Sequence, residues 1–239
     1  MPNHVTTRCV VSGPTERIQA FREKHIVVDK DGLNFDFNSF VPMPASVRDT
    51  ESSSTVEFAL FATGKEDVVP RWSGVPMTSP LTYQWAKDKG IATREEFKTW
   101  LEKEHPDAFA KAEKCIQAQA ETGYSNWYDW SLANWGTKWG AYSFHLVDDK
   151  PVLGGVYMPP LGRLEFVFDT AWSTPEPIFT KMGELYPDLL FRIHSFDEGW
   201  NFGLDAEIRD GKFVIYSNTP TDALYERVYG EAPNHGEEE

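Results

Sequence analysis

The sequence predicts a protein of the α+β class, in which helices cover a mostly antiparallel sheet. Three observations indicate this class. Alternating apolar residues mark strands toward both ends of the chain, a run of amphipathic helical patterns fills the middle, and turn residues separate the later strands. With 239 residues, of which 41% are hydrophobic, the chain is long enough to bury a sizeable core.

The first elements are expected to be a strand, a helix and a second strand. Residues 4–11 are β-branched and apolar, and a Ser-Gly-Pro sequence ends them where a helix can begin. Residues 16–26 carry apolar side chains at helical spacing, with charges between them. Residues 35–41 resume an extended pattern and stop at two prolines. The Ser-rich stretch 48–55 is expected to be a loop.

A helical block follows from residue 79 to residue 136. Thr93 and Glu96 have the spacing of a capping box, which predicts a helix start. A longer helix is expected to end at Gly123, and a short one to span 126–135. Because strand patterns lie on both sides of this block, we interpret it as an insertion between two strands of the sheet.

Strand patterns return after the helical block. Apolar and polar residues alternate over 142–146 and 164–168, so each strand should turn one face inward. Thr174 is expected to cap a helix whose apolar residues, Leu185 included, face the core. An antiparallel meander then follows, with Trp200 on its second strand and a type I′ turn at Asp210-Gly211.

The order of these elements is typical of a ferredoxin-like α/β sandwich with extra antiparallel strands and an inserted helical subdomain. The predicted sandwich comprises residues 1–78 and 137–219, and the predicted insertion comprises residues 79–136. Residues 220–239 are expected to form an acidic tail, because the chain ends in a run of glutamates.

The acidity of the chain argues against binding to nucleic acid. The net charge is −14 with a pI near 4.9, whereas affinity for phosphates comes largely from Lys and Arg. The acidity is compatible with simple solubility or with imitation of DNA toward a basic protein. The start of the chain has no secretory pattern, and no apolar run reaches the length of a membrane span. A cytoplasmic protein of a bacterial host cell, not bound to membrane, is therefore expected.

Three aromatic-rich strings carry a resemblance to a known family. They are Trp127-Tyr128-Asp129-Trp130, Asn134-Trp135-Gly136-Thr137-Lys138-Trp139 and Phe168-Asp169-Thr170-Ala171-Trp172-Ser173-Thr174-Pro175. These strings resemble the YubB ferredoxin-like, Api-type family of proteins carried by conjugative plasmids and phages. The resemblance implies a ferredoxin-like fold with a helical insertion and a home on a mobile genetic element. It implies no biochemical activity.

The same strings supply the candidate binding residues. They are Trp127, Trp130, Asn134, Trp135, Lys138, Trp139, Asp169 and Trp172. Tryptophan offers a large, flat contact area and is enriched among interface hot spots. The alternative is that the indoles pack the insertion onto the sheet. Asp169 and Trp172 stand at a strand-to-helix junction where a small anion could bind, or where these residues form only a cap.

No cofactor, metal or catalytic residue is predicted. The six histidines lack the spacing of a metal site, and the two cysteines lack the setting of a reactive thiolate. His145 and His194 each lie on the polar side of a predicted strand. If those strands are neighbours, the two histidines could form a proton-transfer pair with Asp197 or Glu198.

Three functions follow from these observations. The first is an accessory protein of a phage or plasmid that binds a host protein, as an inhibitor of a defence or nucleic-acid-handling complex, through its acidic surface. The second is a small-ligand binder or unfamiliar enzyme with a pocket between the Trp-rich insertion and the sheet. The third, single-strand nucleic-acid binding, needs Arg163, Lys181 and Arg192 to gather into a cationic groove, which the composition disfavours. The oligomeric state stays open.

Overall fold

The computed structural model describes residues 3–30, 32–68, 78–147 and 162–234. Contacts divide the chain into two compact units. The first unit comprises Met1–Pro42 and Leu132–Glu239, and the second comprises Met43–Ser131. The second unit therefore interrupts the first in the sequence.

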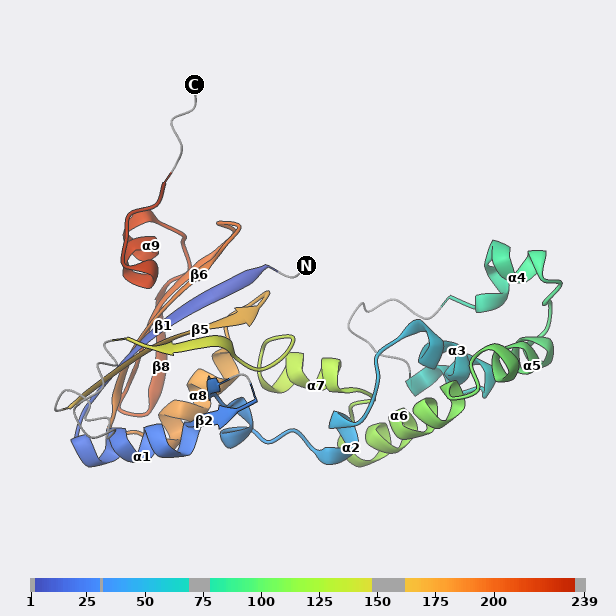
Figure 1. Ribbon diagram of the computed structural model, residues 1–239, viewed down its shortest axis with the longest axis horizontal. Coiled ribbons are helices and arrows are strands. Elements are labelled where there is room, and N and C mark those ends of the chain that lie inside the picture. Colours follow the sequence, from blue (N-terminus) through green and yellow to red (C-terminus); the bar gives the residue numbers. More distant parts are fainter. Residues whose placement is uncertain (1–2, 31, 69–77, 148–161, 235–239) are drawn as a thin grey trace, which may run out of the picture. The chain divides into compact units, whose positions relative to one another are not determined.

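The first unit is built on a six-stranded antiparallel sheet (Figure 1). Its strands are β1 (His4–Ser12), β4 (Tyr142–Leu146), β5 (Arg163–Ala171), β6 (Leu190–Asp197), β7 (Gly203–Arg209) and β8 (Lys212–Ser217). They lie in the order β4-β5-β1-β6-β7-β8. With helices α1 (Thr15–His25) and α8 (Glu176–Leu185), the series β1-α1-β4-β5-α8-β6 follows the ferredoxin-like pattern. The predicted α+β class and sandwich are confirmed.

Alternation along the strands divides the sheet into two faces. On β1, Val5, Cys9 and Val11 are buried, whereas Thr6 and Arg8 between them are only half-buried. The buried face packs against α1 and α8, which lie on the same side of the sheet in Figure 1. Aromatic side chains fill this core, with Phe21, Phe35, Phe166, Phe168, Phe179 and Phe191 fully buried.

The strand expected over residues 35–41 does not form. The chain instead makes a separate two-stranded sheet from β2 (Ile26–Asp29) and β3 (Gly32–Phe35), followed by a 3-10 turn at Phe37–Ser39. The Asp36 carboxylate accepts a hydrogen bond of 3.0 Å from the Asn38 backbone N–H, which favours this turn over a strand. The apolar residues that suggested a strand are buried by the turn itself, because Phe37 and Phe40 both point into the core.

The second unit is entirely helical within its described residues. Its elements are α2 (Ala45–Arg48), α3 (Ser54–Ala62), η2 (Glu66–Val68), η3 (Pro80–Thr82), α4 (Gln84–Asp88), α5 (Arg94–Glu104) and α6 (Ala108–Thr122), and α7 (Trp127–Asn134) begins in it. The capping box at Thr93 and Glu96 is present, and Gly123 ends α6 with a φ of 82°. The sequence-based division placed residues 43–78 with the sheet, whereas contacts place α2 and α3 in the helical unit, where α3 packs on α5 and α6.

The chain after residue 220 is not simply an acidic tail. Thr221 caps α9 (Asp222–Tyr229), which buries Leu224 and Val228 against Phe196 of β6. The helix lies on the side of the sheet opposite α1 and α8 (Figure 1). The glutamate run at 237–239 and the turn expected at 148–151 lie outside the described residues.

Four local expectations about the C-terminal half can now be compared with the structure. Asp210 and Gly211 both have positive φ, at 51° and 75°, as the type I′ turn requires. Leu185 was expected in the core, but 37% of it is exposed, because it lies in the last turn of α8. Trp200 precedes β7 instead of lying on it, and Thr174 makes no side-chain cap to α8.

Candidate binding site

Two segments that are far apart in the sequence form one side of the first unit. The Ser173 hydroxyl donates a hydrogen bond of 2.5 Å to the Gly136 carbonyl, which joins the segment 136–139 to the segment 170–174. Gly136 has a φ of 79°, and a Cβ there would lie 2.8 Å from Pro177 Cδ. Each segment also has an internal hydrogen bond from a threonine hydroxyl. Thr137 donates to the Trp139 carbonyl and Thr170 donates to the Ser173 carbonyl, both at 2.7 Å. Two of the three strings that carried the family resemblance are thus held together by a hydrogen bond.

Two tryptophans and a lysine stand on these joined segments. The Lys138 ammonium lies 4.7 Å from the centroid of the Trp139 ring and 4.6 Å from that of the Trp172 ring. Both distances are within the range of a cation–π contact. The two indoles remain exposed, at 36% for Trp139 and 41% for Trp172. We call Lys138, Trp139 and Trp172 the aromatic site.

The backbone at Trp172 is strained. Its φ is 74°, in the left-handed region that bulky side chains rarely adopt, and its N–H donates to the Asn3 carbonyl at 2.9 Å. A left-handed conformation costs roughly 1–2 kcal/mol for a residue other than glycine. The side chain is 41% exposed, and its remaining surface and the Lys138 contact hold the residue in this conformation.

Acidic and aromatic neighbours extend the aromatic site toward β1. The Trp139 and Tyr142 rings lie edge to face at 6.4 Å, and the Tyr142 hydroxyl is 2.7 Å from His4 Nδ1. Burial raises the pKa of Tyr142 to about 12, and the negative charges of Asp169 and Glu198 add to this effect. Glu198 also accepts a hydrogen bond of 2.8 Å from the His4 backbone N–H.

The other predicted binding residues do not join this surface. Trp135 is buried in the first unit, where its indole N–H donates to the Val41 carbonyl at 2.9 Å. Trp127 and Trp130 belong to the second unit, and Trp130 is buried. Asn134 is half-buried at the end of α7. Trp130 and Trp135 are therefore buried side chains and are not part of the aromatic site.

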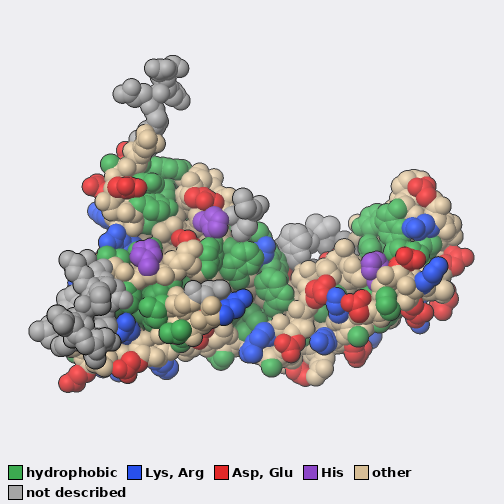
Figure 2. All heavy atoms as spheres, in the orientation of Figure 1, with side chains coloured by type: hydrophobic (Ala, Val, Ile, Leu, Met, Phe, Trp, Pro, Cys, Tyr) green, Lys and Arg blue, Asp and Glu red, His purple; other side chains and the backbone are tan. Residues whose placement is uncertain are grey.

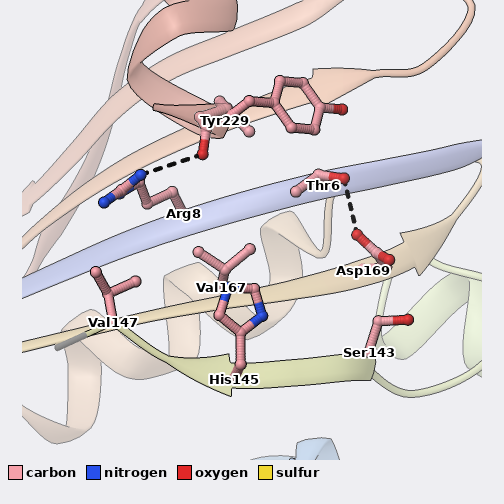
Figure 3. Close-up of a pocket in the computed structure, with 9 residues that line it drawn as sticks. Thr6, Arg8, Ser143, His145, Val147, Val167, Asp169 and Tyr229 are labelled. Atoms are coloured by element: carbon pink, nitrogen blue, oxygen red, sulfur yellow. Dashed lines mark hydrogen bonds between the residues drawn. The ribbon is translucent and has the colours of Figure 1, made fainter. Parts of the chain in front are cut away.

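Asp169 instead takes part in a groove on the outer face of the sheet, beside α9 (Figure 3). The groove has a volume of about 490 Å³. Its lining residues are Thr6, Arg8, Ser143, His145, Val147, Val167, Asp169, Val228 and Tyr229. Thr6 donates to Asp169 Oδ1 at 2.8 Å, and Arg8 Nη1 donates to the Val228 carbonyl at 3.4 Å. The sequence marked only Asp169 and His145 of this set. For Thr6 and Arg8, the available signal was their alternation with apolar residues along β1.

The expected pair of His145 and His194 does not form. His145 is on β4 and His194 is on β6, and strands β5 and β1 lie between them. His194 Nδ1 lies 3.3 Å from Asp205 Oδ1 in a geometry that does not qualify as a hydrogen bond, and burial lowers the pKa of His194. Asp197 is committed elsewhere, because its carboxylate accepts hydrogen bonds from Gly199 and Asn201.

Neither cysteine has the environment of a nucleophile. Burial raises the pKa of Cys9, and the nearby Glu165 carboxylate raises it further. Burial also raises the pKa of Cys115. Among the described residues, no group of three or more His, Cys, Asp or Glu side chains is arranged to hold a metal ion. Likewise, no helix within the described ranges is long and apolar enough to cross a membrane.

No family model matches the sequence, and no curated protein matches it either. A search of solved structures finds the crystal structure of the protein api92 from Yersinia pseudotuberculosis, of the family DUF1281. The sequences are 9% identical, and the match covers 92% of this chain and 99% of that one with a TM-score of 0.43. The comparisons do not support the YubB assignment. The chain is thus similar, at low identity, to a DUF1281 protein, and this likeness is too weak to carry an argument about function.

Proposed function

We propose that the chain is a non-enzymatic binding protein that contacts a partner protein through the aromatic site. The observation that carries this proposal is the left-handed backbone of Trp172, whose indole is 41% exposed. Residues held in a strained backbone conformation cluster at functional positions. Exposed tryptophans on a fixed support are also favourable anchors, because they lose little conformational entropy on binding.

The environment of the site favours a cationic contact on the partner. Two indole faces already accept the Lys138 ammonium, and the carboxylates of Asp169 and Glu198 both act on the adjoining Tyr142. An Arg or Lys of the partner would bind such faces by the same interaction. The overall charge of −14 would favour its approach.

The finer proposal is that the chain serves a phage or plasmid and binds a host protein, as an inhibitor of a defence or nucleic-acid-handling complex. It rests on the sequence resemblance and on the acidity. Imitation of DNA is not part of this proposal, because Lys and Arg are interspersed with Asp and Glu on the face shown in Figure 2. A pocket between the Trp-rich insertion and the sheet stays a prediction.

A matched set of variants tests the binding site. The double variant Trp139→Ala/Trp172→Ala removes the aromatic site. Trp200→Ala removes a tryptophan that is also 36% exposed and has a positive φ of 58°, but whose ring is stacked on Tyr225 at 5.6 Å and is not part of the aromatic site. Each tagged protein is used to capture partners from bacterial lysate, with and without nuclease. Capture of one stoichiometric protein by the wild type and Trp200→Ala, but not by the double variant, is the expected result. Equal capture by all three proteins would refute the proposal.

A further inference from the structure

The groove beside α9 has opposite charges at its two ends. In Figure 3, Arg8 and Val147 line one end, whereas Thr6 and Asp169 line the other. The strand register explains this placement: Arg8 is opposite Val167 and Thr6 is opposite Asp169, on neighbouring strands β1 and β5. Arg8 and Asp169 are therefore diagonal neighbours, and such positions are about 7–8 Å apart.

The arginine end keeps a net positive charge. Arg8 Nε and Arg163 both donate to the Glu165 carboxylate, at 2.5 Å each, so two cations share one anion. Burial raises the pKa of Glu165, but these two hydrogen bonds outweigh it and keep that pKa below its usual value. A guanidinium has five N–H groups. The bonds that Arg8 makes to Glu165 and Val228 within the described residues leave some of these groups for a ligand.

The acidic end carries hydroxyl groups around one carboxylate. Asp169 Oδ1 accepts from Thr6, which leaves Oδ2 to a ligand. Burial raises the pKa of Tyr229, and the charge of Asp169 adds to this, so the phenol stays protonated beside the carboxylate. Ser143 is exposed here with a φ of 52°, at an irregularity in the pairing of β4 with β5. Such bulges often direct a side chain into a site.

Between its two charged ends, the groove has an apolar floor. Val167 lies between the charged positions, and Val147 and Val228 contribute to the walls. His145 is exposed beside Val167, and within the described ranges it has no hydrogen-bond or ion-pair partner. A ligand that fits this arrangement has a charge at each end and an apolar middle.

We propose that this groove binds a small zwitterion of dipeptide size, with its carboxylate at Arg8, its ammonium group at Asp169 and its middle part beside His145 and Val167. Two extended residues span about 7 Å, which is of the same order as the separation of the Arg8 and Asp169 backbone positions. The volume of about 490 Å³ lies in the range of small-molecule sites. This inference shares Asp169 with the surroundings of the aromatic site, but it needs neither the two tryptophans of that site nor the proposed partner protein.

Calorimetric titration of the whole chain with alanyl-leucine tests the proposal. N-acetyl-alanyl-leucine lacks the ammonium group, and alanyl-leucinamide lacks the carboxylate. Because a hydrogen bond to a charged group is a strong one, each blocked dipeptide should bind about tenfold or more weakly than the free dipeptide. If all three compounds bind equally, or if the free dipeptide gives no saturable binding at millimolar concentration, the proposal is wrong.

Two carboxylate variants locate the binding. Asp169→Asn should bind alanyl-leucine only as weakly as the wild type binds N-acetyl-alanyl-leucine. Asp210→Asn makes the same chemical change in the β7–β8 turn, outside the groove, and should leave the affinity unchanged. An unchanged affinity in a folded Asp169→Asn protein would place the dipeptide elsewhere. If Asp169→Asn does not fold, the comparison of the three compounds on the wild type still decides whether the groove binds a zwitterion. Dipeptide binding that is retained in Trp139→Ala/Trp172→Ala would show that it does not depend on the aromatic site of the proposed function.

Discussion

The Lys138 ammonium lies 4.6 Å from the centroid of the Trp172 ring, across two segments that the whole of β4 separates in the sequence. The Ser173 hydroxyl fixes the same approach through its bond to the Gly136 carbonyl. The position of the lysine is therefore set by two loops at once. Four measurements test how single residues of the first unit contribute to its stability.

Glycine at position 172 should stabilise the protein relative to alanine. Both substitutions remove the indole, but only glycine adopts a φ of 74° without a clash of Cβ. The free energy of unfolding of Trp172→Gly should exceed that of Trp172→Ala by about 1 kcal/mol. Urea unfolding followed by circular dichroism gives this difference. At Trp139, whose φ is not positive, the order should reverse. The same order at both positions would contradict the strain at Trp172.

Alanine at Gly136 should cost more stability than alanine at Gly230. Both glycines have a φ near 80°, so both substitutions carry the left-handed penalty of roughly 1–2 kcal/mol. Only at Gly136 would the new Cβ also meet Pro177 Cδ at 2.8 Å, whereas at Gly230 the nearest atom is Arg8 Nη1 at 3.6 Å. Gly136→Ala should therefore lower the free energy of unfolding by about 1 kcal/mol more than Gly230→Ala. Equal losses in urea unfolding would show that the two segments separate easily.

His25 should make stability depend on pH below neutrality. Burial lowers the pKa of His25 from 6.5 to about 3, and the neutral ring lies between Ser39 Oγ and the Tyr186 hydroxyl at 2.6 and 2.7 Å. The unfolded chain therefore binds the proton more readily, so stability is full above pH 6.5 and falls as the pH decreases from 6.5 toward 3.

The matched variant for this effect is His25→Gln, which does not titrate. From pH 7 to pH 4, the free energy of unfolding of the wild type should fall more steeply than that of His25→Gln. Proton NMR of the folded protein should show no titration of the His25 ring above pH 5. Titration near pH 6.5 would mean that the ring is accessible to water.

Leu224→Ala should destabilise the first unit by about 2–4 kcal/mol, because it removes a buried side chain that joins α9 to the sheet. Only 3% of Leu224 is exposed. Glu226→Ala changes an exposed residue of the same helix and should alter the free energy of unfolding by less than about 0.5 kcal/mol. Thermal unfolding followed by far-UV circular dichroism compares the two. Similar stabilities would mean that α9 contributes little to the fold.

The strands and helices with strong periodicity could be predicted from the sequence, and two kinds of element could not. The alternation in 142–146 and the capping box at Thr93 each depend on neighbours within a few residues, so they are visible locally. The 3-10 turn at Phe37–Ser39 and the helix α9 depend on distant partners, namely the aromatic core and Phe196. Tertiary contacts decided these segments, and single-sequence patterns do not contain them.

The candidate site shows the same division. Lys138, Trp139 and Trp172 were recognisable because they stand in unusual aromatic strings, although nothing local showed that the strings meet. The groove was largely hidden, because Thr6, Arg8 and Tyr229 come from elements that only the strand register and the docking of α9 bring together. Trp130 and Trp135 were indistinguishable from surface tryptophans, since burial cannot be read from residue type.

The position of the second unit within the first sets an order of events during synthesis. Of the two neighbours of β1 in the sheet, β5 begins at Arg163 and β6 begins at Leu190, whereas β1 ends at Ser12. At about 5–20 residues per second, the ribosome needs roughly 8–30 seconds to supply the first of these partners. The helical unit is contiguous in sequence and complete before β5 exists. The first strand of the protein is thus left unpaired while the inserted unit folds, and that interval is when the nascent chain most needs protection from aggregation.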